Sequence, residues 1–131
     1  MLRARLWPDE TPDEHAAEAR ESLGDADLLA LLCRTGRGEP IGFAEAAIRR
    51  DYVNGCETSP VVFLEGIYVV PEHRRSGVAR ALCARIAEWG RTKGCTEFAS
   101  DALLDNRASQ AFHAAAGFEE TERVVYFRRL L

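Results

Sequence analysis

Residues 61–70 form the longest nearly continuous hydrophobic stretch of the chain, with β-branched, aromatic or aliphatic side chains at most positions. A short run of this composition predicts a buried strand. Gly66 interrupts the run, and a glycine inside a strand indicates a bulge or the close approach of another backbone or a ligand. Pro71 follows, and we expect the strand to end there because proline has no N–H for the ladder.

The apolar period then changes to that of a helix. Hydrophobic side chains recur four, four and three residues apart along one face, at Val78, Leu82, Ile86 and Trp89. Between strand and helix lies a polar turn, residues 72–77, that contains two arginines and ends in Gly77. The first turn of a helix leaves backbone N–H groups unpaired at the positive end of the dipole, so the pattern predicts an anion site. The alternative is a solvated, arginine-rich turn that only caps the helix.

The remaining chain alternates between helical and strand patterns. Thr11, Pro12 and Glu14 form a capping box with proline at the first helical position, which predicts a helix up to about Ser22. We further expect helices at 2–7 and 106–116, strands at 28–35, 41–50, 95–101 and 120–128, and a polar loop at 52–60. This layout predicts an α+β sandwich with a mixed sheet in a single domain, 1–131.

Length and composition exclude several classes of protein. The chain has 131 residues, 47% hydrophobic and 29% charged, as expected for one globular domain. It contains no apolar run of about 20 residues and no signal-peptide pattern, so we expect no membrane association. A net charge of −4 argues against a nucleic-acid partner. Four cysteines without CxxC spacing predict no metal site and a reducing, cytoplasmic location.

The charges are unevenly placed. Arg74, Arg75 and Arg80 gather at the predicted anion site. Ten acidic residues lie elsewhere in the sequence: Asp9, Glu10, Asp13, Glu14, Glu57, Glu65, Asp101, Glu119, Glu120 and Glu122. An anionic cofactor combined with a cationic second substrate would suit this division. We interpret Asp13, Glu119 and Glu120 as solvated surface charges.

Two motifs, in this order, resemble those of the GNAT N-acetyltransferase superfamily. Residues 74–79 fit the pattern Q/R-x-x-G-x-G/A, and residues 106–118 fit N-x-x-A/S-x-x-F/L-Y/H-x-x-x-G-F. Neither a P-loop nor a three-glycine dinucleotide fingerprint is present. The resemblance implies acetyl-CoA as co-substrate and the superfamily's fold. That fold normally begins with a strand ahead of its first helices, and this chain has no candidate for it. Either the sequence starts after that strand or the fold loses an edge strand.

Longer stretches are similar to the aminoglycoside 6′-N-acetyltransferases over nearly the whole chain. They include DYVNGCETSPVVFLEGIYVVPEHRRSG, GCTEFASDALLDN and GFEETERVVYF. The resemblance implies transfer of an acetyl group to the 6′-amine of an aminoglycoside antibiotic by direct attack in a ternary complex. It also implies antibiotic resistance as the biological role and a homodimer as the assembly.

The resemblance assigns roles to individual positions. The acceptor contacts fall on Trp7, Tyr52, Glu65, Asp101 and Glu122, and on Glu10, which replaces a histidine of the family. The cofactor contacts fall on Ile67, Tyr68 and Val69 in the strand, on Arg74, Arg75, Ser76, Gly77, Val78, Ala79 and Arg80 in the turn and helix, and on Asn106. Many superfamily members have a tyrosine acid at the position of His113, whose imidazole is either the acid here or a structural side chain.

Elementary chemistry supports a carboxylate at the acceptor site. An ammonium must lose a proton before its nitrogen attacks a thioester, and a neighbouring carboxylate holds the cation and accepts that proton. Asp101 and Glu65 are the best candidates because charged residues in hydrophobic strands need a reason to be there. An ion pair with Arg123 is an alternative for Glu122. A bulge at Gly66 would free a backbone N–H for the oxyanion.

Two other functions remain open at this point. The domain could acetylate another amine, such as a polyamine or a peptide N-terminus, with the same cofactor site and a different acceptor pocket. It could also be a non-catalytic CoA-binding remnant or an interaction module.

Overall fold

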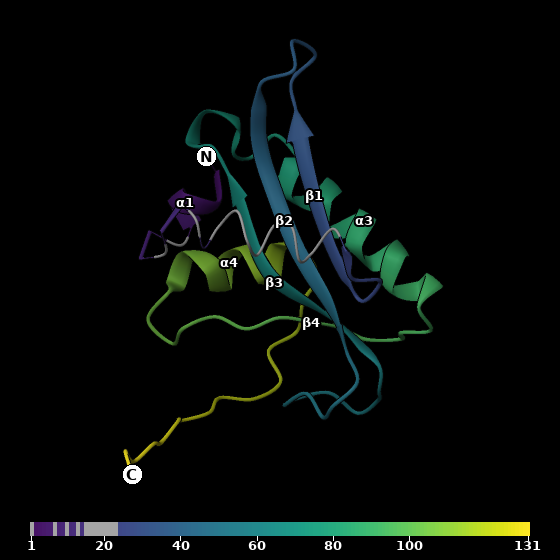
Figure 1. Cartoon of the computed structure of the whole chain (residues 1–131), viewed down its shortest axis with the longest axis vertical. Helices are drawn as coiled ribbons and strands as arrows, with labels where there is room; N and C mark the ends of the chain where they lie inside the picture. Colours follow the sequence, from purple (N-terminus) through teal and green to yellow (C-terminus); the bar gives the residue numbers. More distant parts are fainter. Residues whose placement is uncertain (1, 7, 10, 13, 15–23) are drawn as a thin grey trace.

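The computed structural model describes residues 2–6, 8–9, 11–12, 14 and 24–131. The helices are α1 (Leu2–Leu6), the 3-10 turn η1 (Pro71–His73), α3 (Val78–Thr92) and α4 (Arg107–Ala115). The strands are β1 (Leu28–Arg34), β2 (Pro40–Arg49), β3 (Val61–Val69) and β4 (Phe98–Ala99). Helix α3 lies against one face of the sheet, and Phe112 of α4 packs against the same core cluster, whereas α1 packs against the opposite face (Figure 1).

The strands form one mixed sheet in the order β1-β2-β3-β4. The first three strands are antiparallel to their neighbours, whereas β4 runs parallel to β3. The mixed sheet of the predicted α+β sandwich is therefore confirmed. Among the described residues no strand precedes Leu28. No helix in the described ranges has the length and apolarity to cross a bilayer.

Side-chain alternation along β2 divides the core between two faces. Ala44, Ala46 and Ile48 pack with Leu82 and Ile86 of α3. Residues of the opposite parity pack with α1 in a second cluster, which contains Leu2, Ile41, Phe43 and Val70. The apolar face predicted for α3 is thus buried against the sheet, and its Ile86 side chain is completely buried.

The predicted interruption of the central strand is a β-bulge. Glu45 pairs with Gly66 and Ala46 pairs with Leu64, so Glu65 has no partner residue on β2. The extra residue reverses the alternation of β3. Leu64 belongs to the core beneath α3, and after the bulge Ile67 faces that core. The bulge also turns the Glu65 side chain outward, where it is exposed.

A close approach between α3 and β3 explains the glycine near the end of the helix. A Cβ atom at Gly90 would lie 2.6 Å from Cγ1 and 2.8 Å from Cβ of Val62. Because atoms cannot be that close, only glycine allows the helix to lie at this distance from the strand. This contact fixes how α3, and therefore its N-terminal turn, sits on the sheet.

The capping box predicted at the second helix is present. The backbone N–H of Thr11 donates to Glu14 Oε2 at 2.6 Å, and the N–H of Glu14 donates to Thr11 Oγ1 at 3.2 Å. Residues 15–23 of that predicted helix lie outside the described residues.

Two strand predictions need correction. The strand expected at 95–101 is confined to Phe98–Ala99, where it pairs with β3. The strand expected at 120–128 is wrong for this chain taken alone, because residues 118–131 have no strand structure and lead away from the sheet (Figure 1). No strand of the described chain pairs with this segment, and an alternating sequence forms a strand only where another strand accepts its hydrogen bonds. Val125 and Phe127 are consequently 77% and 91% exposed.

Candidate active site

The predicted anion site lies between η1 and α3. Gly77 caps α3 with φ of 88°, and Arg75 before it has φ of 61°. The first hydrogen bond of the helix runs from Ala81 N–H to Gly77 C=O at 2.9 Å, and no side chain caps the turn. The N–H groups of residues 78–80 therefore remain for an anion. A Cβ atom at Gly77 would meet nothing within 4 Å, so this approach is open.

The arginines of this turn point in different directions. Nε of Arg74 donates to the Val69 carbonyl at 2.8 Å, which turns that side chain back toward β3. Nη2 of Arg80 donates to the Ala115 carbonyl at 3.3 Å and links α3 to the end of α4. Arg75 makes no hydrogen bond or ion pair with the described residues. It is therefore the cation of this turn best placed to meet an anionic ligand.

The sheet opens beside the anion site. β3 and β4 pair only at Val62↔Phe98 and Phe63↔Ala99. Beyond that point β3 continues to Val69 without a described strand on its β4 side, so the two strands diverge there. The edge includes the three β3 positions assigned to the cofactor, Ile67, Tyr68 and Val69. Backbone groups of this edge can bind an extended ligand in the manner of an added strand, although the Val69 carbonyl already accepts a hydrogen bond from Arg74.

Asn106 stands at the start of α4. Its Oδ1 accepts a hydrogen bond from the Ser109 N–H at 3.1 Å, which makes Asn106 the N-cap of the helix. Its amide nitrogen donates to no group among the described residues and stays available to a ligand.

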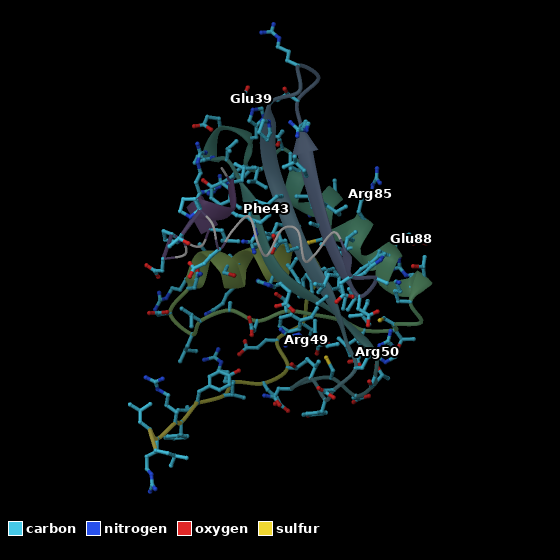
Figure 2. All side chains as sticks on the ribbon, in the orientation of Figure 1. Glu39, Phe43, Arg49, Arg50, Arg85 and Glu88 are labelled. Atoms are coloured by element: carbon cyan, nitrogen blue, oxygen red, sulfur yellow. The ribbon has the colours of Figure 1, made fainter. Side chains whose placement is uncertain are left out.

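The two carboxylates proposed as bases differ in their surroundings. Glu65 accepts hydrogen bonds from Arg49 at 2.9, 3.0 and 3.1 Å, and the Arg49 guanidinium also lies 3.6 Å from the centre of the Phe63 ring. Figure 2 shows Arg49 beside Arg50 at the end of β2 that is farther from Glu39. Asp101 is exposed and has no hydrogen bond or ion pair to a described residue. A cation therefore reaches Asp101 without displacing an arginine.

The ion pair considered for Glu122 is formed by a different carboxylate. Arg123 pairs with Glu120, with a distance of 3.5 Å between Nη2 and Oε2. This pair lowers the pKa of Glu120 and raises that of Arg123. Glu122 has no such partner among the residues that the structure describes.

A cleft of about 630 Å³ brings acidic residues together. We call it the acidic cleft; it is lined by Tyr52, Gly55, Cys56, Glu57, Glu97, Glu119, Glu120, Thr121 and Glu122. The structure thus joins Tyr52 and Glu122, two of the predicted acceptor contacts, whereas Glu65 and Asp101 do not line this cleft. Glu119 and Glu120, interpreted from the sequence as solvated surface, belong to its wall.

Glu97 was missed by the sequence analysis. Its Oε1 accepts hydrogen bonds from the N–H groups of Glu57 and Thr58 at 2.9 and 2.7 Å, and from the Thr58 hydroxyl. The bond from the Thr58 side chain is the main reason that the pKa of Glu97 is lowered. The carboxylate stays ionised and holds the 52–60 loop at the cleft. The available signal was a charged residue inside a segment predicted to be a strand.

His113, for which an acid role was one of two interpretations, is partly buried and contacts several groups of the fold. Its Nε2 lies 2.8 Å from Ser100 Oγ, and its Nδ1 lies 2.6 Å from the Ser109 carbonyl oxygen. The rings of Phe112 and Phe118 stand edge-on to the imidazole at centroid distances of 5.3 and 5.2 Å.

The remaining predictions concern two acceptor-site residues, a metal site and the cysteines. Trp7 and Glu10 lie outside the described residues. Within the described part of the chain no His, Cys, Asp and Glu side chains cluster as a metal site would require. All four cysteines are free thiols, and Cys83 and Cys95 are buried. Burial raises the pKa of the Cys83 thiol to about 11.

Comparison with known proteins agrees with this geometry. The model of the "Acetyltransferase (GNAT) family" matches residues 2–118. The aminoglycoside N(6′)-acetyltransferase type 1 of Salmonella typhimurium is 53% identical over 128 residues, covering 98% of this chain and 88% of the relative.

Two solved structures superpose on nearly the whole of this chain. The aminoglycoside 6′-N-acetyltransferase AAC(6′)-Ih from Acinetobacter baumannii superposes with a TM-score of 0.96 at 52% identity, covering 99% of this chain and 88% of that one. The structure of AAC(6′)-Iy in complex with the bisubstrate analog CoA-S-monomethyl-acetylneamine gives a TM-score of 0.94 at 50% identity, with the same coverage. With a family match across most of its length and relatives at about half identity, the chain belongs to the GNAT acetyltransferase family.

Proposed function

We propose that this protein transfers the acetyl group of acetyl-CoA to the 6′-amine of an aminoglycoside. The observation that carries the proposal is the pairing of an open anion site at the start of α3 with an acidic cleft beside Tyr52. The first suits the pyrophosphate of CoA and the second suits a polycation. The relatives named as aminoglycoside 6′-acetyltransferases, one of them with a bisubstrate analog, support the same pair of substrates.

Acetyl-CoA is assigned to the groove between β3, β4 and α3. Its pyrophosphate would bind the N–H groups that follow Gly77, with Arg75 as the neighbouring cation. The backbone of Ile67 and Val69 would hold the pantetheine arm, and the free amide of Asn106 would donate to it. When bound, acetyl-CoA supplies the thioester carbon that the amine attacks.

Asp101 is the group we assign to the acceptor amine. Its carboxylate is exposed and without a described partner, so it can hold the ammonium and accept the proton that must leave before attack. Glu65 is less suited as a base because Arg49 already neutralises it. We assign Glu65 to binding, through exchange of Arg49 for a substrate ammonium, and a backbone N–H at the Glu65–Gly66 bulge to the oxyanion.

The remaining rings of an aminoglycoside are assigned to the acidic cleft. Tyr52 and Glu122 line it together with the carboxylate of Glu57. A polyamine or a peptide N-terminus would use less of this charge, and this difference favours an aminoglycoside over another amine.

A substrate panel tests the function. Purified protein is supplied with acetyl-CoA and with kanamycin, spermidine or a short peptide, and released thiol and acetylated product are measured. We expect turnover with kanamycin at the 6′-amine and much less with the other amines. Preferential turnover of spermidine or the peptide would favour another amine acetyltransferase, and CoA binding without any transfer would indicate a non-catalytic domain.

We further propose that the enzyme is a homodimer, that it is cytoplasmic, and that it consists of one domain, 1–131. Its proposed biological role is resistance to aminoglycoside antibiotics. The exposed apolar side chains of 124–127 support a dimer, since full burial of each is worth about 1.5–3 kcal/mol. Light scattering at micromolar concentration should give a dimer that Phe127→Asp dissociates, whereas Arg128→Ala, a neighbouring change without loss of apolar area, should not. A wild-type monomer would contradict the dimer.

A further inference from the structure

The imidazole of His113 is held by groups from two separate segments. Ser109 lies one turn earlier on α4 and offers its backbone carbonyl to Nδ1. Ser100 follows β4 directly and offers its hydroxyl to Nε2. The aromatic edges of Phe112 and Phe118 fix the plane of the ring between them. His113 and Ser100 therefore act as one unit, with a defined orientation.

The chemistry of these contacts fixes the tautomer. A carbonyl oxygen only accepts, so the Nδ1 that lies 2.6 Å from the Ser109 carbonyl oxygen is assigned a hydrogen. The Ser109 hydroxyl, 3.3 Å from the same Nδ1, is the longer contact and then acts as a second acceptor. In the neutral ring Nε2 is then an acceptor, and the Ser100 hydroxyl donates to it across 2.8 Å. When the ring gains a second proton, Nε2 becomes a donor to Ser100 Oγ. The hydroxyl hydrogen of Ser100 must then turn away from the ring.

Ser100 also occupies a special place in the sheet. It comes one residue after the last β3–β4 pair, Phe63↔Ala99, and one residue before Asp101. It therefore stands where the two strands separate. His113 has both ring nitrogens engaged, so it cannot donate to a ligand without breaking one of these bonds. Once the protonated ring donates from Nε2 to Ser100 Oγ, the hydroxyl hydrogen of Ser100 is released and can be donated to a ligand.

We propose that Ser100 protonates the leaving thiolate and that His113 positions Ser100 and supplies its proton. As the carbon–sulfur bond breaks, sulfur takes the Ser100 hydroxyl proton, and Ser100 Oγ takes the Nε2 proton of the imidazolium. Solvent reprotonates the ring and receives the proton that Asp101 removed from the amine. Together these transfers move one proton from the nitrogen of the acceptor amine to the sulfur of CoA. This assignment rests on the proposed acetyl transfer and adds Ser100 to it as a catalytic residue.

The tautomer is tested on the protein without substrate. Histidine labelled with 15N gives distinct two-bond correlation patterns for the two neutral tautomers, and loss of one pattern in His113→Gln assigns it. We expect the Nδ1–H form, with an Nε2 shift that changes in Ser100→Ala. The Nε2–H form would leave Nδ1 without the hydrogen that it donates to the Ser109 carbonyl, and would overturn the proposed cycle of the ring between a neutral Nδ1–H form and the imidazolium.

Single-turnover kinetics with acetyl-CoA and kanamycin test the role in transfer. Ser100→Ala should slow the chemical step by about 10²-fold, the low end for acid catalysis, because a thiolate leaves readily even when unprotonated. Ser100→Thr keeps the hydroxyl and should restore most of the rate. Ser100→Ala combined with His113→Gln should be no slower than the slower single variant, because the two act as a unit.

Two controls separate this proposal from others. Thr96→Ala removes a hydroxyl from the same segment, where its only described contact is Thr58 at 3.4 Å, and should leave the rate unchanged. Calorimetry should give the same CoA affinity for Ser100→Ala and wild type. A wild-type rate in Ser100→Ala, or an acetyl-serine at position 100 detected by mass spectrometry, would refute the relay. Failure of wild-type transfer to every amine would instead refute the proposed function.

Discussion

Replacing Gly77 by aspartate should separate cofactor affinity from stability. The residue has φ of 88°, a conformation in which aspartate and asparagine are the least strained of the ordinary side chains. We expect a strain of about 1 kcal/mol, partly offset by about 0.3–1 kcal/mol from a negative charge at the helix N-terminus. Because the new Cβ meets no other atom within 4 Å, no clash is added. The melting temperature should therefore change by no more than about 4 °C.

Binding of CoA should respond much more strongly. The added carboxylate would lie within a few ångströms of the proposed pyrophosphate, and two unit charges about 4 Å apart interact by about 4 kcal/mol at a protein surface. Screening by salt reduces this figure, so we expect a loss of about 1.4–4 kcal/mol, or about 10–1000-fold in Kd.

Calorimetry on three proteins measures the effect. Gly77→Asn has the same shape and backbone strain as Gly77→Asp but no charge, and it should bind CoA within about threefold of wild type if charge is the main determinant. A wild-type affinity in well-folded Gly77→Asp would refute the pyrophosphate site at the start of α3. Equal losses in the aspartate and asparagine variants would attribute the effect to shape instead.

Three further predictions follow from particular contacts. Gly90→Val should destabilise the fold by about 1–3 kcal/mol in urea unfolding because its side chain collides with Val62; an unchanged midpoint would contradict the close packing of α3. Cys83 should resist thiol reagents at neutral pH in the native protein because burial raises its pKa to about 11, and rapid native labelling of its peptide would show that the helix opens. The lowered pKa of Glu97 means that its ionised form stabilises the fold above its ordinary value of 4.5 and that this stability is lost as the pH falls through the lowered value. The melting temperatures of wild type and Glu97→Gln should therefore converge on acidification, and a gap independent of pH would contradict the role of the charge.

Local patterns predicted the parts of the site that local chemistry builds. The glycine at 66 indicated the bulge, and the turn that ends in Gly77 indicated the open helix terminus. Both depend on a few neighbouring residues, whose backbone preferences are readable from the sequence. The capping pair of Thr11 and Glu14 belongs to the same class.

Interactions between distant segments could not be predicted in this way. Arg49 neutralises Glu65 because the two strands pair in a particular register, and Glu97 holds a loop about 40 residues earlier in the chain. The alternation at 120–128 is a true strand pattern, but a pattern cannot provide the neighbouring edge. The contacts of Ser100 and Ser109 with His113 likewise depend on how α4 lies against the segment after β4.

Steady-state kinetics of Asp101→Asn with kanamycin test the central claim most directly. The substitution keeps the shape of the side chain and removes its charge and basicity. We predict a fall in kcat/KM of about 10²–10⁴-fold, with CoA affinity and melting temperature unchanged because Asp101 has no described partner in the fold. Wild-type kinetics in this variant would remove Asp101 from the mechanism and leave Glu65 as the next candidate. A joint loss of stability and of both substrates would show that Asp101 is structural.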